Sequence, residues 1–249
     1  MKTFCIAALV GFTSATTIPG RGAMSNQEPT TADVATWADL AAAVATSGTY
    51  TLAPAFSMDG FSASHGQGIG IEVDVTILGQ GAVLDAKEAG TFFFVNGASL
   101  TLKNLTLQNG YVDYHQGGAV YNTGTLTASD CHFSGNNAYI DGNGGAVWNS
   151  GTFTATDCDF SRNGASRSPG PGPGTNNGRG GAVYNSDPGA KTTFYGGWTF
   201  TNNTADMGPD VYNDNGGAVV FVTCAGKQEP MGDCCTVPAP TPPCPTPVE

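Results

Sequence analysis

Positive charge is scarce in this chain of 249 residues. Lysine and arginine number 9 against 20 aspartate and glutamate residues, which gives a net charge of -11. Proteins that bind nucleic acid or anionic membranes present clusters of basic residues to phosphate groups, and an excess of negative charge repels those groups. The composition therefore argues against nucleic acid and anionic lipid as partners.

Long hydrophobic runs are also missing. The apolar run from Phe4 to Phe12 follows Lys2 and precedes three small residues, and it is too short to span a bilayer. This layout is typical of a secretory signal peptide. We therefore predict a signal peptide over residues 1–15, a disordered leader over 16–35, no transmembrane segment, and a secreted protein located outside the cell or at its surface.

Charged residues make up only 12% of the chain, whereas glycine is abundant, with 36 residues. Such a composition is unusual for a helical protein and favours a turn-rich all-β fold. The sequence has no phosphate loop, dinucleotide fingerprint or nucleophile elbow, and its three histidines share no metal-ligand spacing. We predict no cofactor, with Ca²⁺ as the one ion that the acidic residues could hold.

Two short strings recur along the chain. Gly-Gly-Ala-Val occurs four times, and Phe-x-x-Asn accompanies it three times. Repetition at this spacing is the signature of a solenoid. The strings begin at Gly117, Gly144, Gly180 and Gly216, and at Phe133, Phe160 and Phe200.

The fourth Gly-Gly-Ala-Val string breaks the period. The residues correctly placed after Phe200 are Asp210-Val211-Tyr212-Asn213, so Val211 replaces Val219 in the repeat. Upstream, Phe94-Val95-Asn96 is aligned with Val120-Tyr121-Asn122. One longer interval contains the insertion Ser166 to Arg179, whose alternating proline and glycine cannot join a β ladder.

This alignment predicts a right-handed parallel β-helix of about five coils over residues 36–226, followed by a Cys/Pro-rich tail over 227–249. A capping helix near 36–47, with Thr36 as its N-cap, is expected to cover the open end of the coils. Positions that are apolar in every coil should point inward. An asparagine column is expected at corners of left-handed backbone: Asn96, Asn122, Asn149, Asn185 and Asn213.

Six of the seven cysteines lie outside the expected signal peptide. An even number in an exported chain suggests disulfides, although the pairing cannot be read from the sequence. Cys131 and Cys158 fall in an inward column, where we favour small buried hydrophobic residues over a bond between coils. The disulfide candidates are Cys131, Cys158, Cys224, Cys234, Cys235 and Cys244.

The combination of both strings in register resembles the repeats of the polymorphic outer membrane protein family, which belongs with the pectin-lyase-like right-handed β-helices. The resemblance covers roughly Leu40 to Cys224. It implies a surface-exposed or secreted protein, often adhesive, without a known catalytic apparatus. We expect a freely secreted relative of this repeat.

Enzymes that cut acidic polysaccharides also use β-helices, and they need carboxylates held together on one face. The best local set is Asp130, Asp157 and Asp159, flanked by Arg162. Asp130 and Asp157 share one column and could share a cation. The alternative, which we favour, is that they are turn residues bonded to the backbone, because Asn104 holds the same position one coil earlier.

A binding surface has more support. The residue after each inward valine should face outward, which gives a row of Val95, Tyr121, Trp148, Tyr184 and Tyr212 whose rings could stack against sugars. The same row could instead lie beneath loops. Arg162, Arg167 and Arg179 bracket the insertion and could bind a carboxylated or sulfated glycan, or simply keep a loop soluble.

The sequence therefore predicts a secreted, non-catalytic scaffold that binds polysaccharide or surface glycans through Tyr121, Trp148, Tyr184, Tyr212, Arg167 and Arg179. Two alternatives stay open. One is a polysaccharide lyase or glycoside hydrolase acting on acidic polysaccharide, and the other is a structural wall or coat component.

Overall fold

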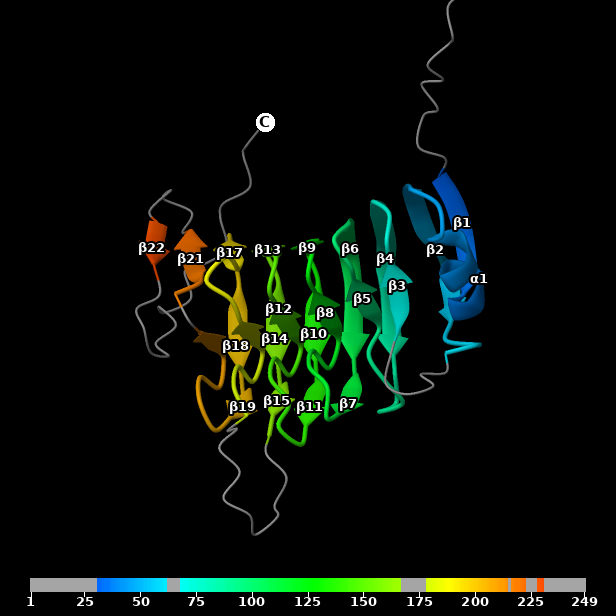
Figure 1. Cartoon of the computed structure of the whole chain (residues 1–249). Coiled ribbons are helices and arrows are strands. Elements are labelled where there is room, and N and C mark those ends of the chain that lie inside the picture. Colours follow the sequence, from blue (N-terminus) through cyan, green and yellow to red (C-terminus); the bar gives the residue numbers. More distant parts are fainter. Residues whose placement is uncertain (1–30, 62–67, 167–177, 215, 223–227, 231–249) are drawn as a thin grey trace, which may run out of the picture.

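The chain forms a parallel β-solenoid of about six turns, seen from the side in the computed structural model of Figure 1. The structure describes residues 31–61, 68–166, 178–214, 216–222 and 228–230. Each turn contributes strands to neighbouring sheets, and every strand pair in these residues is parallel except β21 with β22. The predicted parallel β-helix is confirmed, with about six turns where about five were expected, because the sequence alignment began at Phe94 and did not include strand β3 (Ile69–Ile71).

Three sheets run along the stack, the shortest over only four strands. The longest, sheet A, is built from β1 (Thr31–Thr36), β2 (Gly48–Ser57), β4 (Val75–Asp85), β6 (Ser99–Gln108), β9 (Thr125–Ser129), β13 (Thr152–Thr156), β17 (Lys191–Tyr195), β21 (Ala218–Val222) and β22 (Gln228–Pro230), with β10 (His132–Ser134), β14 (Asp159–Ser161) and β18 (Thr199–Thr201) beside this path. Sheet B contains β3, β5 (Phe93–Val95), β8 (Val120–Asn122), β12 (Val147–Asn149), β16 (Val183–Asn185) and β20 (Val211–Asn213). Sheet C contains β7 (Tyr111–Asp113), β11 (Asn137–Tyr139), β15 (Gly164–Ala165) and β19 (Thr204–Ala205).

The register of sheet B confirms most of the sequence alignment. Val147 pairs with Val120 and Val183, and Val183 pairs with Val211, so the shift of the last repeat to Val211 is confirmed. Val219 instead lies in β21 of sheet A.

The upstream end of the alignment is wrong by one residue. Phe93 pairs with Val120, Phe94 with Tyr121 and Val95 with Asn122. The cause is an extra residue in the turn. Three residues separate Val95 from Ser99, whereas only two separate their respective partners, Asn122 and Thr125. Phe93 therefore points inward, Phe94 joins the outward aromatic row, and Val95 takes the place of the asparagine.

The N-terminal end begins earlier than predicted. Strand β1 lies within the segment 16–35 that was expected to be disordered, and it pairs in parallel with β2. Helix α1 (Trp37–Ala43) follows directly, with Thr36 as its N-cap accepting a hydrogen bond from the Asp39 amide. Trp37 packs against Phe92 and the core, so the helix covers the interior at this end, while the edge of sheet A is strand β1 itself.

The other end also extends beyond its predicted boundary. Strand β22 lies in the segment 227–249 that was expected to be a tail, and it pairs with β21 in the antiparallel sense. The expected insertion falls largely on residues 167–177, outside the described residues. On either side of it the stack keeps its register, because Gly164 pairs with Asn137 and Val183 with Val147. No helix among the described residues is long and apolar enough to cross a membrane.

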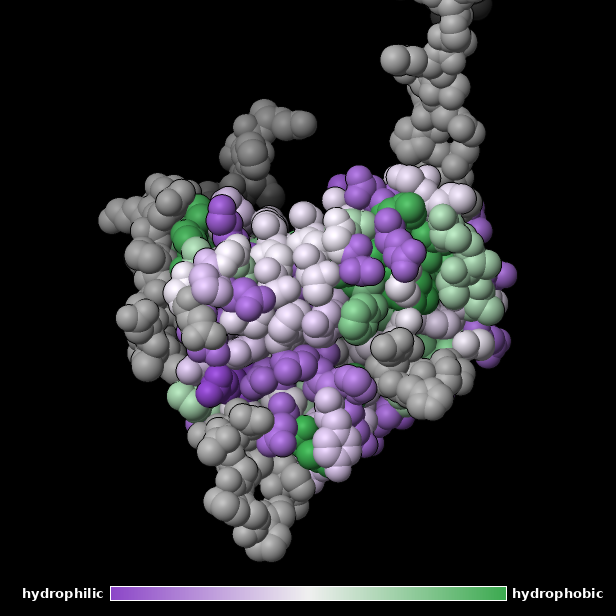
Figure 2. Space-filling view, viewed as in Figure 1, coloured by the Kyte–Doolittle hydropathy of each residue, from purple (hydrophilic) through white to green (hydrophobic). Residues whose placement is uncertain are grey.

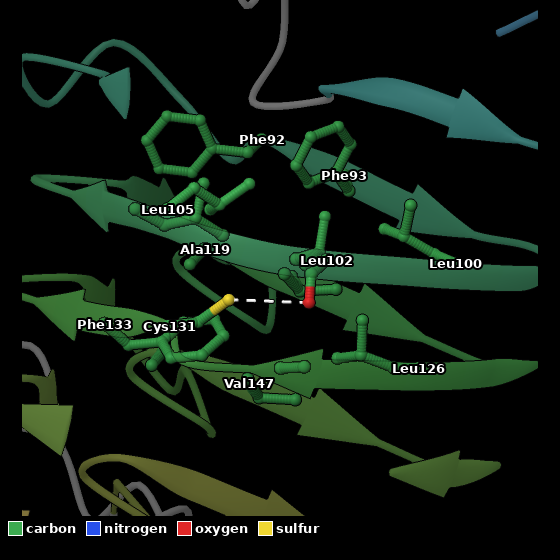
Figure 3. Packing of buried hydrophobic residues seen from close by; sticks show 14 of the residues in the cluster. Phe92, Phe93, Leu100, Leu102, Leu105, Ala119, Leu126, Cys131, Phe133 and Val147 are labelled. Carbon is green, nitrogen blue, oxygen red and sulfur yellow. Dashed lines mark hydrogen bonds between the residues drawn. The ribbon is translucent and has the colours of Figure 1, made fainter. Parts of the chain in front are cut away.

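The interior is filled by stacked columns of apolar side chains (Figure 3). Leu107, Phe133, Phe160 and Phe200 form one such column, as expected for positions that are apolar in every coil, and the centroids of the stacked phenylalanine rings lie 4.9 and 5.1 Å apart. Cys131 and Cys158 are fully buried free thiols, as the favoured interpretation predicts. The Cys131 thiol donates to the Leu102 carbonyl at 3.6 Å, and the contact with Cys131 together with burial raises the pKa of Cys158 well above its usual range.

Asparagine amides form two ladders along the stack. In one, each Nδ2 donates to the Oδ1 of the next coil, at 2.7 Å from Asn122 to Asn149, 2.8 Å from Asn149 to Asn185 and 2.8 Å from Asn185 to Asn213. The prediction of left-handed backbone here is wrong, because these residues end extended strands. Asn96 is exposed and outside the ladder. The second ladder joins Asn136, Asn163 and Asn203.

Candidate functional sites on the solenoid surface

A row of aromatic side chains runs along the outer face of sheet B. Its members are Phe94, Tyr121, Trp148, Tyr184 and Tyr212, one from each of five successive strands. The ring centroids of Phe94 and Tyr121 lie 4.2 Å apart, and those of Tyr121 and Trp148 also lie 4.2 Å apart, with nearly parallel planes. These rings therefore cover one another's faces and leave mainly their edges for a ligand, which corrects the expectation that each ring stacks on a sugar.

The C-terminal part of the row is held by a polar cluster. The Tyr184 hydroxyl donates to Asp214 at 2.7 Å, and the Arg179 guanidinium donates to the same carboxylate at 2.9 Å. Arg179 also lies over the Tyr212 ring, 5.4 Å from its centroid. Tyr184 is only 6% exposed, and burial together with Asp214 raises its pKa to about 12. Two of the predicted binding residues, Arg179 and Tyr184, are thus engaged in contacts within the protein.

Among the described residues, none covers the N-terminal end of the row. Phe94 pairs with Gly70 of β3, which has no side chain, and a methyl group added at Gly70 would meet no atom within 4 Å. Beside Phe94 and Tyr121 lies a depression of about 320 Å³ whose wall continues through Tyr114, His115 and Gln116. Tyr114 is 73% exposed, and Gln116 is held in place by the Asn143 amide, which donates to its Oε1 at 3.3 Å.

A second depression, of about 350 Å³, lies over β10, β14 and β18. His132 Nδ1 lies 2.9 Å from Asp159 Oδ2, and the Thr199 hydroxyl donates to the other oxygen of Asp159. On the same surface, Ser134 Oγ accepts from Arg162 Nη2 at 3.2 Å and from Ser161 Oγ at 3.1 Å. The structure therefore brings two of the catalytic candidates, Asp159 and Arg162, to one depression and adds His132.

Asp130 and Asp157 do not line this depression. Both have left-handed backbone, with φ of 53° and 52°, and Asn104 has φ of 51° at the same corner one coil earlier. The Asp157 carboxylate accepts a hydrogen bond from the Gly197 amide at 2.6 Å. Both aspartates thus occupy left-handed turn positions, which Asn and Asp tolerate, and the predicted bond from the side chain to the backbone is present at Asp157.

Five of the predicted residues lie outside the part of the chain that the structure describes: Arg167, Cys224, Cys234, Cys235 and Cys244. In the part of the chain that the structure describes, no three His, Cys, Asp or Glu side chains gather as a group that could hold a metal ion. Binding of Ca²⁺ stays a prediction.

In comparisons with known proteins, no family model, curated protein or solved structure matches the chain. The resemblance to polymorphic outer membrane protein repeats therefore stays a prediction, and function must be argued from the two depressions and the surface around them.

Several residues of these depressions were missed at the sequence level. His132 pairs with Asp159 in adjacent strands, so the coil register already placed them side by side. Tyr114 could not be placed from the repeat, because it lies in a corner with left-handed backbone, φ 56°. Gly70, which pairs with Phe94 beside the depression, was missed because strand β3 was not recognised.

Proposed function

We propose that this protein is a secreted, non-catalytic β-solenoid that binds glycans at a cell surface or in an extracellular matrix. The observation that carries the proposal is the open end of the aromatic row, where the Phe94 ring adjoins a polar-walled depression. Binding sites for small ligands are concave and mostly apolar, with a few polar groups that fix orientation.

The depression and the surface beside it supply both kinds of contact that a sugar needs. The Phe94 ring lines the depression and is paired with Gly70, which has no side chain to cover it, and the exposed ring of Tyr114 offers a second apolar surface. Gln116 accepts from Asn143 through its oxygen, which leaves its amide nitrogen to donate to a sugar hydroxyl. His115 adds a nitrogen donor or acceptor at the same rim.

Three features of the sequence support the extracellular setting. The first residues have the layout of a signal peptide. The repeated strings resemble those of surface-exposed adhesive proteins, and the net charge of -11 disfavours the phosphate-rich partners found inside cells.

The proposal is tested by screening the full chain on a glycan array and measuring the strongest ligand by titration calorimetry. Gly70→Leu places a side chain over the Phe94 ring, and Tyr114→Ala removes the exposed ring. Each variant should weaken binding by about 3- to 10-fold, the range that an aromatic contact of about 0.5–1.5 kcal/mol implies.

Tyr195→Ala is the matched control, because Tyr195 is another exposed tyrosine, 41% accessible, on sheet A. It should bind like the wild type. Failure of the wild-type protein to bind any glycan, or equal binding by Gly70→Leu and Tyr114→Ala, would overturn the proposal and favour a structural wall or coat component.

A second candidate function is cleavage of acidic polysaccharide. It is favoured by the cluster of His132, Asp159 and Arg162, in which a carboxylate orients an imidazole next to a guanidinium. The imidazole would act as general base and the guanidinium would bind the sugar carboxylate. Release of unsaturated or reducing ends from pectin or alginate by the wild type, lost in His132→Gln, would establish this activity in place of the non-catalytic assignment.

A further inference from the structure

The outer face of sheet A carries a row of threonines that no function above uses. Threonine occupies one outward position in six successive strands, each paired directly with the next in the adjacent coil. The members of this threonine row are Thr49, Thr76, Thr101, Thr127, Thr154 and Thr193. Parallel strands lie about 4.7–4.9 Å apart, so the row repeats at that interval along the solenoid.

Hydroxyl side chains also flank the threonine row along each strand, at right angles to the row. In β6, β9 and β13 the outward positions on either side of it belong to Ser99, Lys103, Thr125, Ser129, Thr152 and Thr156. Eight of the nine outward positions in these three strands thus carry a hydroxyl group. Outward neighbours on one strand are about 6.4–6.8 Å apart, so the hydroxyls form a rectangular lattice.

These hydroxyls are available to solvent. Among the described residues, none of the eight side chains makes a hydrogen bond within the protein, and all eight are at least partly exposed. The nine positions carry no aromatic ring, and Lys103 provides their only charge. A surface of this kind lacks the ring faces that sugars stack on and offers ordered water its partners.

The lattice is also rigid. Sheet A keeps the same register from β6 to β21 without a bulge, and its strands stand side by side along the solenoid (Figure 1). The asparagine ladder holds the adjoining strands, because Asn122 donates to the Thr152 carbonyl at 3.0 Å and Asn149 to the Lys191 carbonyl at 3.1 Å. Side-chain ladders of this kind keep a long sheet flat, and threonine is restricted at χ1.

Figure 2, in the same view as Figure 1, shows the largest group of hydrophobic side chains at the end that holds α1 and β1 to β4 and a smaller group at the opposite end, while the upper part of the middle coils presents mostly pale and hydrophilic surface. The hydroxyl lattice belongs to these middle coils.

From this lattice we infer that sheet A binds ice. A rigid rectangular array of hydroxyl and methyl groups at these two intervals is close to the arrangement of water molecules on faces of hexagonal ice. The hydroxyls would hydrogen-bond to the outermost water layer, and the threonine methyl groups would sit between those waters. This activity is independent of the glycan proposal, because it uses another face of the solenoid.

The inference is tested with the full chain by measuring thermal hysteresis and the uptake of fluorescently labelled protein into a growing ice hemisphere. Thr127→Lys and Thr154→Lys place long charged side chains at the centre of the lattice, so both measures should fall by about tenfold or more. Thr201→Lys is the matched control, an exposed threonine in β18 outside the lattice, and it should behave like the wild type.

Circular dichroism melting curves establish that the variants are folded, which is expected because the changed side chains face outward. Exclusion of the wild-type protein from ice would overturn the inference. Equal uptake of folded Thr127→Lys and wild type would overturn it as well, since binding would then not depend on the lattice. Loss of glycan binding by Gly70→Leu would leave the ice measurements unchanged.

Discussion

Replacement of Asn149 by alanine should be among the most destabilising single changes in this protein. The Asn149 amide donates to Asn185 Oδ1 at 2.8 Å and to the Lys191 carbonyl at 3.1 Å, and its oxygen accepts from Asn122 at 2.7 Å. Alanine removes these three hydrogen bonds together with the longer contacts from Nδ2 to the Gly151 carbonyl at 3.3 Å and to the Thr192 hydroxyl at 3.2 Å. In the variant, Asn122 Nδ2 still donates to the Thr152 carbonyl, and Asn185 Oδ1 still accepts from the Thr192 hydroxyl. The Lys191 carbonyl loses the hydrogen bond that Asn149 donates to it.

At about 1 kcal/mol for each bond, the free energy of unfolding should fall by about 3 kcal/mol. For a domain of this size that corresponds to a drop in Tm of about 6–12 °C, measured by circular dichroism. The control is Asn96→Ala, because Asn96 lies in the turn after β5, exposed and outside the ladder, and its effect should stay within about 0.5 kcal/mol. A shift of less than about 2 °C for Asn149→Ala, or equal shifts for both variants, would refute the role assigned to the ladder.

Two further predictions concern single sites. Gly117→Ala should destabilise the fold by about 2 kcal/mol or more, measured by urea unfolding, because φ is 73° and the new Cβ would lie 2.3 Å from the Val120 carbonyl oxygen. Gly189→Ala, where a Cβ meets no atom within 4 Å, should be nearly neutral. The Tyr184 pKa of about 12 lies above its usual 10, so the folded state favours the neutral phenol, and this stability is lost as the pH rises from 10 towards 12. Tyr184→Phe should therefore show a smaller fall in Tm over that pH range, and an unchanged fall would contradict the contact with Asp214.

The interior of the solenoid could be predicted from sequence because every coil repeats the same constraint. A buried position must be apolar in each turn, so Phe133, Phe160 and Phe200 mark one column whatever the surface does. The same constraint places Val211 in the last repeat, although the Gly-Gly-Ala-Val string points to Val219. Alignment of the coils by sequence fails where the length of a turn varies, as at Asn96. One extra residue in a turn shifts the alignment without disturbing the strands that the turn joins.

The surface was harder to predict, because contacts between coils depend on exact pairing. His132 and Asp159 face each other across neighbouring strands, and the threonine row follows the same register. Both could have been found by writing the outward residues of each coil in columns. The stacking of Tyr121 on Trp148, and the burial of Tyr184 beside Asp214, depend on side-chain geometry that a single sequence does not encode in any repeated string.

The in-register asparagine ladders have a consequence for how such a protein can change over evolutionary time. From Asn122 to Asn213, each rung presents to the next one the same amide pattern that it receives from the one before, so the interfaces between the coils that carry this ladder are interchangeable. Duplication or loss of a whole coil would leave every remaining junction chemically intact. The gene can thus lengthen or shorten the molecule in unit steps, and with it the area of the face that it presents.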